Sequence, residues 1–271
     1  MADLISMSDR CFFKTGDGYQ IAYRFDGSPD KPVLLLSNSI GTTLSMWDTQ
    51  IPAFTKHFRV LRYDSRGHGS SEASAGAYSA DRLGWDAVEL LDSLKIERVH
   101  FCGLSLGGVV GQWLGIHFPE RINRLVLSHT SAYLEHYGNW TELISKALQP
   151  GSLPEIAETF LRNWFPASML EENGEIVRSF RGMLLQTSPQ GLAGSWAAVR
   201  DMDMRRSVAL ISSPTLVLGG RHDTVTLPEH SELIAKTVPE AKLVLLPAVH
   251  LSNVEHPNDF NRIVLEFLLQ Q

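Results

Sequence analysis

One junction constrains the fold of this chain more than any other segment. The apolar run "HFCG" (100–103) is typical of a buried strand, and Ser105 separates it from 106–117, a segment with helical spacing that contains four glycines. A glycine inside a helix costs roughly 1 kcal/mol relative to alanine. A helix with this composition is favoured only where its backbone must pack closely against a neighbouring element. The junction therefore predicts a strand, a tight turn and a closely packed helix.

The glycines around Ser105 predict two structural features. Gly103 and Gly107 flank the serine in a G-x-S-x-G pattern, where a strained strand-to-helix turn requires small neighbours. Gly107, Gly111 and Gly115 recur at every fourth position and form one smooth helix face suited to packing on a sheet. The pattern indicates a nucleophile elbow. The alternative is a tightly packed helix in which Ser105 is only a turn residue.

The rest of the chain alternates between strand and helix patterns, which predicts an α/β fold with a mostly parallel sheet and helices on both faces. The turn 16–18 ("GDG") between two alternating runs predicts an N-terminal hairpin. Ser79 is the expected N-cap of a helix that continues to Leu94. The expected strands lie in the apolar runs at 33–37, 58–64, 98–103, 122–129, 213–220 and 241–247.

The alternation stops between Ser131 and Leu210, where the segment is rich in aromatic residues and its patterns are mostly helical. Residues 1–130 and 211–271 are therefore expected to form one α/β core, and residues 131–210 an inserted helical cap.

Composition limits the classes of partner. The net charge of −6 comes without a basic block, so we expect no nucleic-acid or membrane partner. Cys11 and Cys102 are too few for a disulfide framework or a zinc site. The opening "MADLISMSDR" does not have the pattern of a signal peptide, and no apolar run approaches the ~20 residues of a membrane span. The simplest expected compartment is the cytoplasm, and the sequence assigns no oligomeric state.

A serine nucleophile needs a base, and the base needs an orienting carboxylate. His250 follows the strand pattern "KLVLLPAV" and comes after Ser105 in the chain, so it is the predicted base. Asp223 follows "TLVLGGRH" and is the predicted acid. The order Ser105, Asp223, His250 places all three residues in loops at one edge of the sheet.

Other histidines and carboxylates compete for these roles. His222 also follows a strand, beside Asp223, whereas His129 and His68 are expected to be structural or to line a pocket. Asp64 is the rival acid. It precedes the serine and lies beside Arg66 in a polar turn, where we expect a structural ion pair instead.

A tetrahedral intermediate also needs hydrogen-bond donors for its oxyanion. The backbone N–H of Leu106 opens the predicted helix, where free N–H groups and the helix dipole favour negative charge. The second expected donor is the backbone N–H of Ser39 in the loop "SNSIGTT", with Gly41 keeping that turn open.

These motifs resemble the α/β-hydrolase superfamily over nearly the whole chain. Beyond the elbow, "YDSRGHGSSE" (63–72) is similar to a D-x-R-G-x-G-x-S turn of that superfamily, and "HFPERINRLVL" (117–127) resembles its usual helix exit and next strand. The loop "LLLSNSIGTTLSMWDTQIPAF" (34–54) resembles the 3-oxoadipate enol-lactone hydrolases of the β-ketoadipate pathway.

The resemblance implies a reaction and its residues. It implies hydrolysis of 3-oxoadipate enol-lactone to 3-oxoadipate in aromatic catabolism, without a metal or organic cofactor. It also implies that Ser105, Asp223 and His250 form the triad, and that Ser39 and Leu106 form the oxyanion hole. A carboxylesterase, a carbon–carbon bond hydrolase with the same triad, and a ligand receptor that kept the hydrolase shell remain alternatives.

The substrate of that reaction carries a carboxylate, so its pocket should offer a cation or several N–H and O–H donors. Trp140 and Trp196 are the candidate substrate-binding residues of the cap, because an indole supplies an apolar wall and one donor. Packing within the cap is an equal alternative for both. Four arginines are open candidates for a carboxylate contact: Arg162, Arg178, Arg181 and Arg200.

Overall fold

The computed structural model describes residues 10–134 and 139–270. Eight strands form one sheet in the order β1-β2-β4-β3-β5-β6-β7-β8, in which β1–β2 and β2–β4 are antiparallel and the other neighbours are parallel. The strands are β1 (Cys11–Lys14), β2 (Gln20–Asp26), β3 (Val33–Ser37), β4 (Arg59–Tyr63), β5 (Val99–Leu104), β6 (Ile122–Ser128), β7 (Thr215–Gly220) and β8 (Lys242–Leu246). The predicted mostly parallel sheet and N-terminal hairpin are confirmed.

The α-helices are α1 (Ile51–Phe54), α2 (Ala80–Ser93), α3 (Leu106–His117), α4 (Trp140–Ala147), α5 (Leu153–Trp164), α6 (Ala167–Glu172), α7 (Glu175–Gln186), α8 (Pro189–Asp201), α9 (Pro228–Thr237), α10 (Ser252–Glu255) and α11 (Pro257–Leu268). Ser79 is the N-cap of α2, as predicted, and its hydroxyl accepts from the Arg82 N–H at 3.1 Å. Among these helices, none is both long and apolar enough to cross a membrane.

Two apolar clusters lie on opposite faces of the sheet. Along β5, for example, Phe101 belongs to the cluster that includes buried side chains of α2, α3 and α9, whereas its neighbour Cys102 belongs to the cluster that includes α1 and α11. Successive residues of a strand point to opposite faces, so each buried strand supplies both clusters. This explains why the central strands are continuous apolar runs in the sequence.

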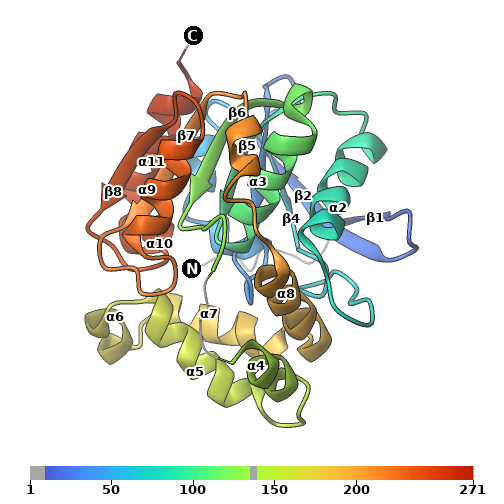
Figure 1. Ribbon diagram of the computed structural model, residues 1–271, viewed down its shortest axis with the longest axis vertical. Helices are drawn as coiled ribbons and strands as arrows, with labels where there is room; N and C mark the ends of the chain where they lie inside the picture. The colour runs from blue at the N-terminus through green and yellow to red at the C-terminus, as the bar shows by residue number, and fades with distance from the viewer. Residues whose placement is uncertain (1–9, 135–138, 271) are drawn as a thin grey trace.

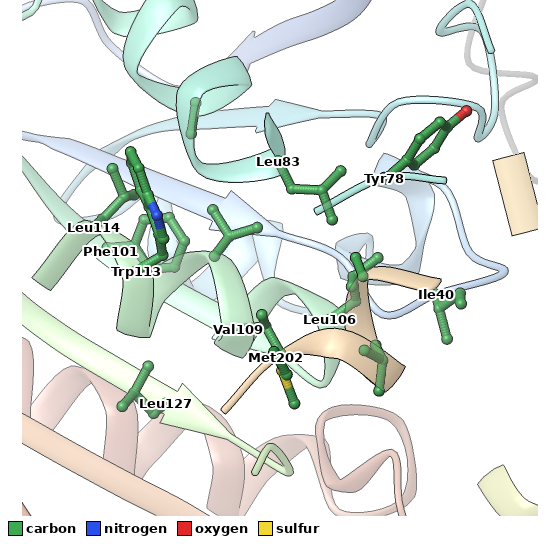
Figure 2. Packing of buried hydrophobic residues seen from close by; sticks show 14 of the residues in the cluster. Ile40, Tyr78, Leu83, Phe101, Leu106, Val109, Trp113, Leu114, Leu127 and Met202 are labelled. Atoms are coloured by element: carbon green, nitrogen blue, oxygen red, sulfur yellow. The ribbon is translucent and has the colours of Figure 1, made fainter. Parts of the chain in front are cut away.

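Helices α4–α8 lie between β6 and β7 in the chain, within the segment 131–210 that the sequence predicts to be a cap, and are called the cap helices below. Figure 1 shows them gathered together, beyond one end of the sheet and below the core in this view. Apolar packing extends from the core into this region: Leu106 and Val109 of α3 belong to the same buried cluster as the sheet residue Phe101 and as Met202, which follows α8 (Figure 2). The start of α3 is therefore held between the core and the cap.

Candidate active site

Ser105 lies at the turn between β5 and α3 in a backbone conformation that side chains rarely adopt. Its φ is 58° and its ψ is −114°. Such a residue stores about 1–3 kcal/mol of strain and persists only where its surroundings hold it. Here the Ser105 N–H donates to the Ser128 carbonyl at 2.9 Å, and the Thr130 hydroxyl donates to the Ser105 carbonyl at 2.9 Å. The end of β6 and the residues after it thus hold both the N–H and the carbonyl of Ser105.

The two glycines of the pattern are required by close backbone contacts. A Cβ at Gly103 would lie 2.1 Å from the Gly107 carbonyl oxygen, and a Cβ at Gly107 would lie 2.1 Å from the Ser37 carbonyl oxygen. Gly111 and Gly115 face sheet side chains, since a Cβ at these positions would lie 2.7 Å from the Phe101 ring and 3.1 Å from Leu125. The predicted glycine face of the helix is confirmed.

Asp223 follows β7, and both oxygens of its buried carboxylate accept hydrogen bonds. Oδ1 accepts from the N–H groups of Val225 and Thr226 at 2.8 and 3.0 Å. Oδ2 accepts from the Thr226 hydroxyl at 2.8 Å, from His250 Nδ1 at 2.8 Å and from His129 Nδ1 at 2.9 Å. Burial alone would raise the pKa of Asp223, but the charge interaction with His250 and the two imidazole hydrogen bonds hold it well below its ordinary value.

The bond from His250 Nδ1 to the carboxylate assigns the tautomer of this histidine. The carboxylate accepts, so Nδ1 carries a proton, and Nε2 is the nitrogen at which the ring can gain or lose one. His250 and Ser105 both line one cavity, although within the described ranges no hydrogen bond joins the Ser105 hydroxyl to the ring. The structure therefore brings the predicted serine and histidine to one cavity, with the predicted aspartate behind the histidine.

The cavity has a volume of about 380 Å³ and lies between the core and the cap. Trp140 and Trp196, the two predicted tryptophans, both line it, and Trp196 stacks on Phe160 with ring centroids 5.9 Å apart. The lining is mostly apolar, and its polar members include Asn163 and Ser131, whose buried hydroxyl has no partner within the described ranges. The other lining residues are Ile40, Leu106, Val109, Thr130, Leu134, Leu143, Thr159, Trp164, Val199, Met202, Val225 and Thr226.

The four candidate arginines have partners on the cap. Arg162 donates to Thr159, Arg181 to Glu158 and Arg200 to Asp201. Arg178 donates to the Asn173 carbonyl. Within residues 10–134 and 139–270, no arginine or lysine lines the cavity.

The two predicted oxyanion donors lie in different environments. Leu106 is the first residue of α3, so its N–H has no partner within the helix. The Ser39 N–H donates to the Met46 sulfur at 3.2 Å, which is a weak acceptor. Asn38, beside Ser39, ties the loop to the elbow, because its carbonyl accepts from the Gly107 N–H at 2.9 Å.

The remaining alternatives resolve as follows. The expected ion pair between Asp64 and Arg66 is wrong: Asp64 accepts from the N–H groups of Leu44 and Ser70 at 2.7 and 2.9 Å. Arg66 instead pairs with Asp86 at 2.6 Å and with Asp17. The competing His222 is exposed. His68 is buried, and its Nδ1 lies 3.0 Å from the Arg66 carbonyl.

The contact between His129 and Asp223 escaped the sequence reasoning. His129 directly follows β6, as Asp223 follows the neighbouring β7, and this shared strand-end position was the available signal. The ligand atoms of His129, Asp223 and His250 all lie within 4.8 Å of one another, which a metal ion could bridge. A cation there would have to replace both imidazole protons on the Asp223 carboxylate, so the arrangement fits a hydrogen-bond network better.

The comparisons with known proteins agree with this geometry. A family model described as "alpha/beta hydrolase fold" matches residues 32–257. The chain is 39% identical to 3-oxoadipate enol-lactonase 2 of Acinetobacter baylyi, over 92% of this chain and 93% of that protein. It is 32% identical to a putative carbamate hydrolase RutD of Stutzerimonas stutzeri, over 90% and 94% of the two chains.

Two solved structures are similar in their overall fold. A hydrolase from Pseudomonas aeruginosa PA01 has a TM-score of 0.95 and 55% identity, covering 98% of this chain and 100% of its own. An enol-lactonase from Burkholderia xenovorans LB400 has a TM-score of 0.92 and 36% identity, covering 96% and 100%. The strand order, the inserted cap and these matches lead to one conclusion: the chain belongs to the α/β-hydrolase fold family and is related to 3-oxoadipate enol-lactonases.

Proposed function

We propose that the protein is a serine hydrolase that opens 3-oxoadipate enol-lactone to 3-oxoadipate through an acyl-enzyme. One observation carries the proposal. The buried Asp223–His250 pair, with Oδ2 and Nδ1 2.8 Å apart, lies beside the cavity, and the His250 imidazole lines that cavity together with Ser105. In this proposal Ser105 is the nucleophile, His250 the general base and Asp223 the residue that orients it.

The reaction proceeds in two stages. His250 Nε2 takes the Ser105 hydroxyl proton as Oγ bonds to the lactone carbonyl carbon. The tetrahedral intermediate collapses, the ring C–O bond breaks, and the imidazolium returns the proton to the departing enol oxygen. The enol then ketonises. His250 next takes a proton from water as the water oxygen bonds to the acyl carbon. The bond between this carbon and Ser105 Oγ then breaks, and the imidazolium returns the proton to Oγ, which releases the second carboxylate and free Ser105.

Leu106 and Ser39 are the proposed oxyanion donors. The Leu106 N–H has no helical partner, and the positive end of the α3 dipole favours a developing negative charge. The Ser39 N–H would exchange its weak thioether acceptor, Met46, for the oxyanion. Since one such donor is worth about 3 kcal/mol of barrier lowering, the exchange is favourable.

The substrate assignment is supported by the relatives and by the size of the cavity. The names of the relatives in Acinetobacter baylyi and Burkholderia xenovorans give that activity to those proteins. A volume of about 380 Å³ is at the small end for ligand pockets and suits a small lactone. The Trp140 and Trp196 indoles and the Asn163 amide are the proposed neutral donors to the substrate carboxylate.

The cavity lining favours a second candidate function, hydrolysis of a neutral ester or lactone. The described lining residues are mostly apolar and include no arginine or lysine. A carboxylate that enters such a site loses its hydration and gains only neutral hydrogen bonds, whereas a neutral acyl group loses little.

The test compares substrates and a nucleophile variant. We expect kcat/KM for 3-oxoadipate enol-lactone to exceed that for p-nitrophenyl acetate, for a neutral enol-lactone and for a simple carbamate by at least about tenfold. Ser105→Ala should lose roughly 10³-fold or more in kcat on the preferred substrate with an unchanged circular dichroism spectrum. Ser179→Ala, at an exposed serine of α7, is the control.

Each outcome decides between the candidates. Faster turnover of the neutral lactone or ester would favour the second function with the same triad. Hydrolysis by Ser105→Ala at the parental rate would overturn the triad assignment.

A further inference from the structure

His129 contacts the Asp223 carboxylate but has no role in the proposed triad of Ser105, Asp223 and His250. It directly follows β6 with a φ of 44°, and its side chain is buried. Nδ1 lies 2.9 Å from Asp223 Oδ2, the oxygen that also accepts from His250 Nδ1. Nε2 lies 2.7 Å from the hydroxyl of Ser252, two residues after His250 in the chain.

The partners of His129 determine its protonation. The carboxylate accepts from Nδ1–H, and burial lowers the pKa of His129 more than the neighbouring Asp223 raises it. The ring is therefore neutral, Nε2 is an acceptor, and the Ser252 hydroxyl donates to it. His129 is thus a bridge between the buried carboxylate and the segment that carries His250.

The residues on either side of His129 hold the nucleophile. The Ser128 carbonyl accepts from the Ser105 N–H, and the Thr130 hydroxyl donates to the Ser105 carbonyl, both at 2.9 Å. The His129 N–H itself donates to the Leu218 carbonyl of β7 at 2.8 Å. Ser128 and Thr130 therefore contact Ser105, whereas His129 between them contacts Asp223, the partner of His250.

We propose that His129 is a positioning residue of this site. By sharing the Asp223 carboxylate and anchoring Ser252, it sets the position of His250 relative to Ser105. The inference rests on the triad of the proposed function.

Two consequences follow from the geometry. The first is positional, because two hydrogen bonds hold the segment around His250. The Ser252 hydroxyl bonds to His129, and the Val249 N–H donates to Glu255 Oε2 at 2.8 Å. The second is electrostatic: a further donor on Asp223 Oδ2 weakens the attraction of this carboxylate for a proton on His250. The charged or titratable groups facing His129 are Asp223, His250 and Glu255, and all three stay in the variants below.

The experiment uses two substitutions at residue 129. His129→Leu removes both ring nitrogens at similar size. His129→Asn is the matched variant, because asparagine tolerates a positive φ and its side-chain amide can donate where Nδ1 does. Ser252→Ala removes only the tether.

For His129→Leu we expect kcat to fall about 10–100-fold with little change in KM, because the base is misplaced while the described cavity lining is unchanged. The acidic limb of the pH profile of kcat/KM should move upward by about 0.5 pH unit or more. His129→Asn should restore the parental midpoint, and Ser252→Ala should lower kcat several-fold without moving it. A low-field proton resonance from an imidazole hydrogen bonded to Asp223 should disappear in His129→Leu.

A parental kcat and midpoint in His129→Leu would overturn the inference. If His129→Leu does not fold, His129→Asn and Ser252→Ala decide: parental kcat in both would overturn it. Failure of the proposed function is distinguishable, because then Ser105→Ala keeps its activity, whereas failure of this inference alone leaves Ser105→Ala inactive.

Discussion

At the scale of single residues, buried imidazoles link stability to pH. His68 is fully buried in the turn after β4, and its Nε2 has no hydrogen-bond partner among the described residues. Burial lowers the pKa of His68 to about 4, despite its hydrogen bond to the Arg66 carbonyl. The charged form is therefore disfavoured in the folded protein, while the unfolded chain binds the proton with an ordinary pKa of about 6.5.

The sign of the pH effect follows from this difference. The contribution of neutral His68 is fully present above pH 6.5 and is lost as the pH falls toward 4, because the unfolded state then takes up a proton that the folded state excludes. Between pH 7 and pH 5 we expect His68 to lower the free energy of unfolding by about 2 kcal/mol. Urea unfolding at the two pH values measures it.

Two variants isolate this effect. His68→Asn can keep a donor to the Arg66 carbonyl but cannot titrate, so the drop between pH 7 and pH 5 should shrink by that amount. His57→Asn, at an exposed histidine, is the control for loss of an imidazole. An unchanged drop in His68→Asn would show that other groups carry the acid sensitivity.

At the scale of secondary-structure elements, α3 combines poor helix propensity with close packing. The summed helix-propensity cost of its glycines is unfavourable for an isolated helix. Along one face, however, Gly107, Gly111 and Gly115 each lie against the backbone or the side chains of a strand. Tertiary contacts therefore stabilise α3, and its first turn is held where Ser105 and Leu106 line the cavity.

This predicts opposite effects of the same substitution in two helices. Gly107→Ala would place a Cβ 2.1 Å from the Ser37 carbonyl oxygen, so the backbone must shift, and we expect a loss of at least about 3 kcal/mol of stability together with loss of activity. Gly182→Ala in α7 meets no atom within 4 Å and should stabilise by about 0.5–1 kcal/mol. Thermal and urea unfolding measure both. A neutral Gly107→Ala would contradict the packing argument.

At the scale of the whole molecule, the core and the cap helices together line the cavity. Ser105, Thr226 and His250 come from core loops, whereas Trp140, Phe160 and Trp196 come from the cap helices α4, α5 and α8. Figure 1 shows the cap on one side of the core, attached between β6 and β7. We propose that residues 131–210 form a unit that sets substrate preference without taking part in bond making.

Exchange of the cap tests this proposal. Replacement of residues 131–210 by the cap of an esterase should change the ratio of kcat/KM between the enol-lactone and p-nitrophenyl acetate by at least about tenfold. Hydrolysis should still require Ser105, as measured with Ser105→Ala in the chimera. If the ratio stays at its parental value, the core loops determine specificity.

Much of the fold was determined by the sequence through local chemistry. Apolar strand runs alternating with helical patterns, the turn "GDG" and the Ser79 cap act over short distances, so their signals lie within each segment. The places of Ser105, Asp223 and His250 followed from the same logic, because each comes after a strand and parallel strands end at one sheet edge.

Contacts between distant segments were decided only by the tertiary structure. Arg66, which follows β4, pairs with Asp86 of α2 and not with its near neighbour Asp64, because the carboxylate of Asp64 accepts from two backbone N–H groups. His129 reaches Asp223 and Ser252 because β6, β7 and β8 are neighbours in the sheet. Sequence patterns carry the period of each element, but a side chain's partners depend on which elements lie beside it, and only the packed chain fixes that.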